Sequence, residues 1–89
     1  MQLPDEVNDD LTRRLRRIEG QVRGIQQMLA DGRECRDVVA QVSAASKALD
    51  QVGFKMLASG LSSCLADPAA AEASGFSLDE LERLFLKLA

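Results

Sequence analysis

Apolar residues recur at steps of three and four along most of the chain, the spacing that places side chains on one face of an α-helix. The first such series consists of Leu11, Leu15, Ile18, Val22, Ile25, Met28 and Leu29. The Asp31-Gly32 pair that follows is typical of a helix end with the glycine in the left-handed conformation. These features predict a helix over residues 11–30.

A second and longer series predicts a helix over residues 33–66. Its apolar positions alternate strictly between steps of three and four, which is the pattern of a heptad seam. They are Cys35, Val38, Val42, Ala45, Leu49, Val52 and Met56. A parallel row continues through Leu61 and Cys64. The Asp67-Pro68 pair is expected to stop the helix, and residues 69–75 are expected to form a loop.

The last apolar series predicts a third helix over residues 77–88. Ser77 is a candidate N-cap, and Glu80 three residues later completes a capping box. Phe76 and Leu81 are placed to form a hydrophobic staple across this start. Residues 1–10 are acidic and show no apolar period, so they are expected to form a flexible arm. The predicted fold is a single all-α domain over residues 1–89, with three helices and a long middle one.

The length of the middle helix bears on assembly. A helix of about 30 residues extends roughly 45 Å, which exceeds the width of a compact chain of 89 residues. Small domains also bury little surface alone, so we expect a homodimer or higher oligomer formed through the heptad helix. Nothing in the sequence resembles a signal peptide or a membrane span, and a cytoplasmic location is expected.

The composition narrows the chemistry. The chain contains no histidine, which excludes an imidazole base, a histidine-ligated zinc ion and a histidine-rich nickel site. No set of base, nucleophile and oxyanion-binding groups can be assembled, so an enzyme is not expected. The net charge of −3, from 11 basic and 14 acidic residues, does not by itself indicate nucleic-acid binding. The distribution of the charges is more informative.

A cluster of arginines lies near the start of the first predicted helix. It consists of Arg13, Arg14, Arg16 and Arg17. At 100° per residue, three of them fall opposite the apolar stripe and Arg14 lies on its flank. Gly20 and Gly24 continue the outward face and indicate close approach of another backbone or of a ligand. Copies of the cluster in an oligomer suit DNA phosphates. The alternative is a solvated face on which Arg16 or Arg17 pairs with Glu19, and spacing leaves both open.

The two cysteines are candidate sensing residues. Cys35 lies in the first turn of its helix between two arginines, where the helix dipole and their charges favour a thiolate, although two nearby acidic residues oppose it. Cys64 is 29 residues later (64 − 35), about 43 Å along a continuous helix. An antiparallel pair of copies with its two-fold axis near Leu49 and Asp50 sets Cys35 level with the partner's Cys64. The alternative is that both are small buried hydrophobes.

The stretch RRLRRIEGQVRGIQQML, from Arg13 to Leu29, followed by Cys35 and the long helix, resembles the copper-sensing operon repressor (CsoR) family of bacteria. The resemblance covers roughly residues 8–66. It implies an antiparallel helical dimer that assembles into a tetramer and represses transcription by binding operator DNA without a helix-turn-helix. It also implies that the inducer is sensed between protomers.

The resemblance bears on the inducer as well. Copper sensors of the family carry Cys, His and Cys at positions that correspond to Cys35, Gly60 and Cys64, and the histidine is missing here. Two cysteines without it resemble the persulfide-sensing CstR-like branch, in which such thiols form an inter-subunit di- or polysulfide and no cofactor is needed. Cu(I) bound by the same two thiolates is the alternative. A helical interaction module with neither DNA nor inducer is the alternative of another class.

Overall fold

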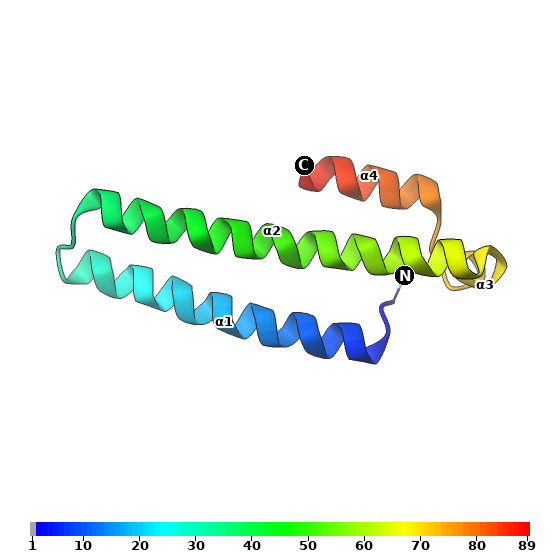
Figure 1. Ribbon diagram of the computed structural model, residues 1–89, viewed down its shortest axis with the longest axis horizontal. Helices are drawn as coiled ribbons and strands as arrows, with labels where there is room; N and C mark the ends of the chain where they lie inside the picture. The colour runs from blue at the N-terminus through cyan, green and yellow to red at the C-terminus, as the bar shows by residue number, and fades with distance from the viewer. Residues whose placement is uncertain (1) are drawn as a thin grey trace. The chain divides into compact units, whose positions relative to one another are not determined.

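The computed structural model describes residues 2–89. Four helices follow one another: α1 (Asp5–Ala30), α2 (Cys35–Ala66), α3 (Pro68–Ala73) and α4 (Leu78–Leu88) (Figure 1). The described part of the chain contains no strand, so the predicted all-α class is confirmed, with four helices in place of three. The four helices are divided between two compact units. One is residues 10–52, and the other combines the segment before Asp10 with residues 53–89.

The first helix begins earlier than predicted. The expected arm over residues 1–10 is wrong from Asp5 onward, where the chain is helical, while Met1 lies outside the described residues. The Asn8 N–H donates to the Pro4 carbonyl at 3.0 Å, which closes the first turn. Asp5 and Glu6 then lie at the positive end of the helix dipole. The acidic residues therefore stabilise a helix start.

The turn between α1 and α2 has the predicted glycine. Gly32 adopts φ of +69°, and the Arg33 N–H donates to the Met28 carbonyl at 3.0 Å, as in a Schellman ending. The second helix begins at Cys35, two residues after the predicted start (35 − 33). Glu34 precedes it, and its carbonyl accepts the N–H of Val38 at 3.1 Å. Cys35 is thus the first helical residue of α2.

The predicted loop over residues 69–75 is wrong for its first part, because α3 forms there. The Asp67 carboxylate caps this helix by accepting the Ala70 N–H at 3.1 Å, and Pro68 occupies the first turn. Proline is favourable at that position because its missing N–H has no partner to lose there. The alanines that follow have high helix propensity. Asp67-Pro68 therefore ends one helix and begins another.

The unit of residues 10–52 is an antiparallel hairpin of α1 and the first part of α2 (Figure 1). Its buried apolar residues are spaced by seven on each helix: Leu11 and Ile18 on α1, and Val38, Ala45 and Val52 on α2. Other apolar residues of the two predicted series are exposed to solvent. They are Leu15, Val22, Leu29, Val42 and Leu49. A single hairpin thus buries only half of each predicted seam.

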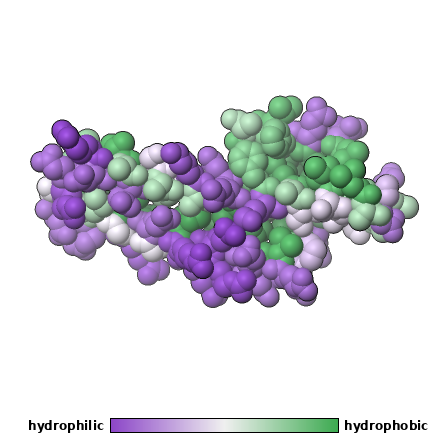
Figure 2. Space-filling view, in the orientation of Figure 1, coloured by the Kyte–Doolittle hydropathy of each residue, from purple (hydrophilic) through white to green (hydrophobic). Residues whose placement is uncertain are grey.

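The other unit packs α3 and α4 against the second part of α2. Ser77 caps α4 as predicted, since its hydroxyl accepts the Glu80 N–H at 3.2 Å. The core of this unit is a cluster of Cys64, Ala71, Phe76 and Leu81, against which Leu3 and Leu57 pack. The outer side of α4 remains apolar and exposed, as the green surface in Figure 2 shows. Within residues 2–89, no helix is apolar and long enough to span a membrane.

Candidate functional site

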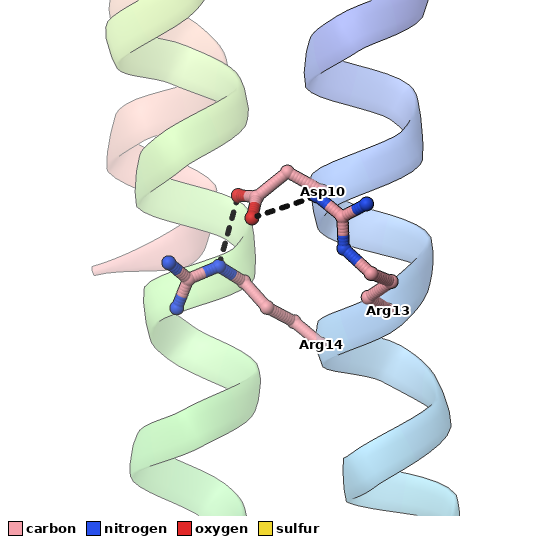
Figure 3. A network of polar contacts seen from close by, with 3 residues as sticks. All are labelled: Asp10, Arg13 and Arg14. Carbon is pink, nitrogen blue, oxygen red and sulfur yellow. Dashed lines mark hydrogen bonds and ion pairs between the residues drawn. The ribbon is translucent and has the colours of Figure 1, made fainter.

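The arginine cluster lies on α1 within the hairpin unit. Arg13, Arg16 and Arg17 are exposed, and Arg14 is half-buried with 34 % of its side chain accessible. The Asp10 carboxylate lies between two of the guanidinium groups (Figure 3). It accepts a hydrogen bond from Arg14 Nε at 3.0 Å and lies 3.8 Å from an Arg13 nitrogen. Asp10 thereby forms ion pairs with two of the four arginines.

Arg16 and Arg17 are the free members of the cluster. Glu19, the carboxylate closest to them in sequence, pairs instead with Arg23 at 3.5 Å. In the part of the chain that the structure describes, Arg16 and Arg17 form no ion pair. Their two positive charges therefore face solvent without neutralisation. This arrangement differs from the solvated face with Glu19 pairs that the spacing also allowed.

The two glycines on the outward face of α1 leave open space beside the helix. A Cβ on Gly20 or on Gly24 would meet no other group of the chain within 4 Å. No packing within the chain therefore requires a glycine at either position.

The two cysteines differ sharply in exposure. Cys35 is exposed at the first residue of α2, whereas Cys64 near the other end is 7 % exposed. Because they lie at opposite ends of one continuous helix, a single chain does not bring the sulfurs together. The described residues also hold no group of three or more His, Cys, Asp or Glu side chains that could bind a metal ion. Any dithiol site therefore needs two chains.

Cys64 lies beneath the segment that leads into α4. It belongs to the cluster with Phe76 and Leu81, and it forms part of the wall of an open hollow of about 400 Å³. Ser77 and two carboxylates, Glu72 and Asp79, border the same hollow. Cys64 is thus largely covered by apolar side chains, and the hollow that it borders carries both apolar and polar side chains.

Gly60 is the position at which α4 comes closest to this part of α2. A Cβ there would lie 2.8 Å from Leu81 Cδ2 and 3.3 Å from the Phe76 ring. Sequence reasoning identified Gly60 only as a missing histidine and did not single out Gly53, whose Cβ would lie 2.7 Å from Leu88 Cδ2. The seven-residue spacing of two glycines on an apolar helix is the signal that could have found this contact surface.

Comparisons with known proteins agree with this architecture. The copper-sensing transcriptional repressor CsoR of Bacillus subtilis is 39 % identical over 79 residues, which cover 89 % of this chain and 78 % of that protein. The crystal structure of the copper-sensing repressor CsoR with Cu(I) from Geobacillus thermodenitrificans superposes with a TM-score of 0.79 at 37 % identity, covering 98 % of this chain and 91 % of the other.

A second solved structure has a different inducer in its name. The nickel-responsive transcriptional regulator InrS superposes with a TM-score of 0.77 at 33 % identity, covering 91 % of each chain. The fold is therefore shared by regulators named for different metals, and the inducer depends on particular side chains. Residues 7–87 match the family described as metal-sensitive transcriptional repressors. With most of its length matched, this all-helical chain belongs to that family of repressors.

Proposed function

We propose that this protein is an operator-binding repressor that senses persulfides and polysulfides through Cys35 of one protomer and Cys64 of another. The observation that carries the proposal is the glycine at the position where the resemblance to copper sensors of the family places their histidine. That residue is Gly60, and the whole sequence contains no histidine. Two thiols without an imidazole are the groups left to respond to an inducer.

The packing around Gly60 supports this assignment. Leu81 and Phe76 already occupy the space into which a side chain at position 60 would extend. An imidazole there would require α4 to move away from α2. Position 60 therefore contributes helix packing in place of a ligand, and a soft metal ion would have to be held by fewer protein groups.

The sulfur chemistry balances with the two thiols alone. The Cys35 thiolate attacks the sulfane sulfur of a low-molecular-weight persulfide, whose S–S bond breaks and whose thiolate leaves, so that Cys35 carries the persulfide. The partner's Cys64 thiolate then attacks the Cys35 Sγ, hydrosulfide leaves, and a disulfide joins the protomers. When both cysteines carry a persulfide, the same attack expels one hydrosulfide and leaves a trisulfide.

The DNA-binding surface of the proposal is the cluster of Arg13, Arg14, Arg16 and Arg17, acting in the cytoplasm where the operator lies. Arg16 and Arg17, which form no ion pair with any residue from 2 to 89, need none broken before they contact phosphate. An oligomer presents several copies of the cluster, and phosphate neutralisation adds over the copies. If the protein were an interaction module that does not bind DNA, these unpaired charges would have no role.

Self-association is supported by the exposed half of the hairpin's seam. Val42 is 49 % exposed and Leu49 is 52 % exposed, although both continue the heptad pattern of α2. A second hairpin packed antiparallel covers such a row and forms a four-helix bundle. The same pairing, with its two-fold axis near Leu49, brings Cys35 level with the partner's Cys64.

Replacing Leu49 with glutamate is expected to weaken this dimer by at least about a hundredfold, because the axis would bury two like charges. Sedimentation equilibrium measures the dissociation constant. Gln51→Glu adds the same charge to an exposed position of α2 and is expected to leave the dimer unchanged. Equal effects of the two substitutions would show that α2 does not pair in this way.

The proposed inducer is tested by intact mass under non-reducing conditions. Reduced protein is treated separately with glutathione persulfide and with Cu(I), and operator binding is followed in the same samples. A covalent dimer, with or without extra sulfur of about 32 Da, is expected with the persulfide together with loss of DNA binding. Persulfide treatment that leaves the chain uncrosslinked and bound to DNA would contradict sulfur sensing.

Cu(I) is the second candidate inducer because the Bacillus subtilis relative and the Geobacillus thermodenitrificans structure are named as copper-sensing repressors. Two thiolates from different protomers, Cys35 and Cys64, are ligands that this soft ion accepts. Its result in the same experiment is stoichiometric Cu(I) binding and DNA release with no crosslink. A Cu(I) chelator would then restore DNA binding, whereas the sulfur crosslink needs a reductant.

A further inference from the structure

α4 lies directly against the second part of α2 because α2 carries glycine at two points of contact (Figure 1). A Cβ on Gly53 would lie 2.7 Å from Leu88 Cδ2, and one on Gly60 would lie 2.8 Å from Leu81 Cδ2. Both distances are well below ordinary carbon–carbon contact. A larger group at either place therefore requires the neighbouring leucine side chain, or α4 itself, to shift.

The two contacts differ in how freely the neighbouring side chain can move. Leu88 is half-buried at the last residue of α4, so its side chain can turn away from a methyl group at position 53. Leu81 is 7 % exposed, and the equally buried Phe76 ring lies beside it. The neighbours of a side chain at position 60 therefore have no such freedom to turn away. Gly60 is therefore the contact that fixes how closely α4 docks.

Cys64 lies one helical turn after Gly60 and on the same face of α2. Phe76 and Leu81, which enclose Gly60, also form the cluster that buries the Cys64 side chain. Phe76 is in addition part of the wall of the hollow that Cys64 borders. The segment from Phe76 to Leu81 thus contributes both to the cover of the thiol and to the border of the hollow, together with Ala71 and Glu72 of α3.

The Phe76 N–H donates to the Ala71 carbonyl of α3 at 2.8 Å, whereas α4 itself is held against α2 by apolar contacts. Within residues 2–89, no hydrogen bond or ion pair joins α4 to α2. An aromatic contact between Phe54 and Phe85, with ring centroids 5.5 Å apart, adds to the leucine contacts. Because these contacts have no directional bonds, α4 can leave α2 as a unit while α2 stays helical.

We propose that α4 is a removable cap over the Cys64 thiol and that Gly60 sets how tightly the cap closes. Cys35 reacts in the capped state, whereas Cys64 reacts slowly there and faster once α4 has moved. The part of the cap in sensing rests on the proposed function: crosslinking of Cys64 to a partner's Cys35 selects the detached position of α4. Formation of the crosslink at Cys64 and displacement of α4 are then coupled to each other.

The cap is tested without any inducer, by the rate at which iodoacetamide alkylates Cys64 in the reduced Cys35→Ser protein. Gly60→Leu is expected to raise this rate at least about tenfold, and Gly60→Ala by a smaller factor, because the added side chain displaces Leu81 and Phe76. Mass spectrometry after timed quenching measures the rate.

Gly24→Leu and Gly24→Ala are the matched controls, since they make the same changes at a helical glycine where an added Cβ meets no described group within 4 Å. Their alkylation rates are expected to stay within about twofold of the parent, and circular dichroism checks helix content in every variant. Rates in the Gly60 variants equal to those in the Gly24 variants would overturn the cap.

A second pair of variants shortens side chains on α4. These variants test the proposal even if a Gly60 variant fails to fold. Leu81→Ala removes the contact with position 60 and is expected to accelerate alkylation of Cys64. Leu86→Ala makes the same change at a residue that is 66 % exposed, and no acceleration is expected. If Leu81→Ala does not accelerate alkylation of Cys64, the proposed cap is wrong. That outcome has no bearing on the persulfide experiment, because the alkylation assay contains no inducer.

Discussion

The double substitution Arg16→Ala and Arg17→Ala is expected to lower operator affinity by at least about a hundredfold at roughly 0.15 M salt. These two guanidinium groups face solvent without a carboxylate partner, so the substitution takes two positive charges from the DNA-binding surface of every copy in the oligomer. The slope of log affinity against log salt should flatten by about 0.9 for each phosphate that is no longer neutralised. Fluorescence anisotropy with labelled operator over a salt series measures both quantities.

The control removes the same number of charges from elsewhere. Arg83→Ala with Lys87→Ala takes two exposed positive charges from α4 and is expected to change operator affinity only slightly. If both double variants weaken binding equally, net charge rather than the α1 surface accounts for the effect. Helix content and oligomeric state are expected to stay unchanged in both, since alanine is favourable at exposed helical positions.

Removal of either thiol is expected to abolish covalent dimers completely, but the two variants should accumulate different species. Cys64→Ser keeps the exposed attacking thiol, so treatment with persulfide should leave Cys35 about 32 Da heavier and the chain uncrosslinked. Cys35→Ser keeps only the buried thiol, which should react slowly. Non-reducing intact mass distinguishes these products.

The DNA-binding readout makes the cysteine experiment decisive. Both reduced variants are expected to bind operator as tightly as the parent protein, because neither thiol lies in the arginine cluster. Both should keep binding after persulfide treatment, since the crosslink cannot form. Release of DNA by persulfide in Cys64→Ser would remove the resolving role from Cys64 and leave modification of Cys35 alone as the signal.

The sequence pattern predicted the long elements of the fold well. The extents of α1 and α2 follow from uninterrupted series of apolar residues, and the Gly32 turn and the Ser77 cap follow from short-range hydrogen bonding. Residues 5–10 and α3 were missed because their helices depend on end effects. Asp5 and Asp67 act at helix N-termini, where an acidic residue stabilises helix and turn alike.

The candidate site was predictable in composition and less so in arrangement. The arginine cluster and both cysteines are visible in the sequence, but which arginine Asp10 pairs with depends on rotamers at the start of α1. The sequence left burial of both cysteines open, but it could not predict that Cys64 is buried and Cys35 exposed, because the burial of Cys64 depends on how α3 and α4 fold back on α2. Gly60 shows the same limit, since its close contact with Leu81 is a tertiary one.

The apolar row that the hairpin leaves exposed also has a consequence for gene dosage. If a second copy covers the exposed row that includes Val42 and Leu49, assembled repressor forms by a second-order process. While most chains are unpaired, doubling synthesis then more than doubles the assembled form. A small cut in expression accordingly costs a disproportionate share of repression, and unpaired chains with an open apolar face are the ones that proteases remove first.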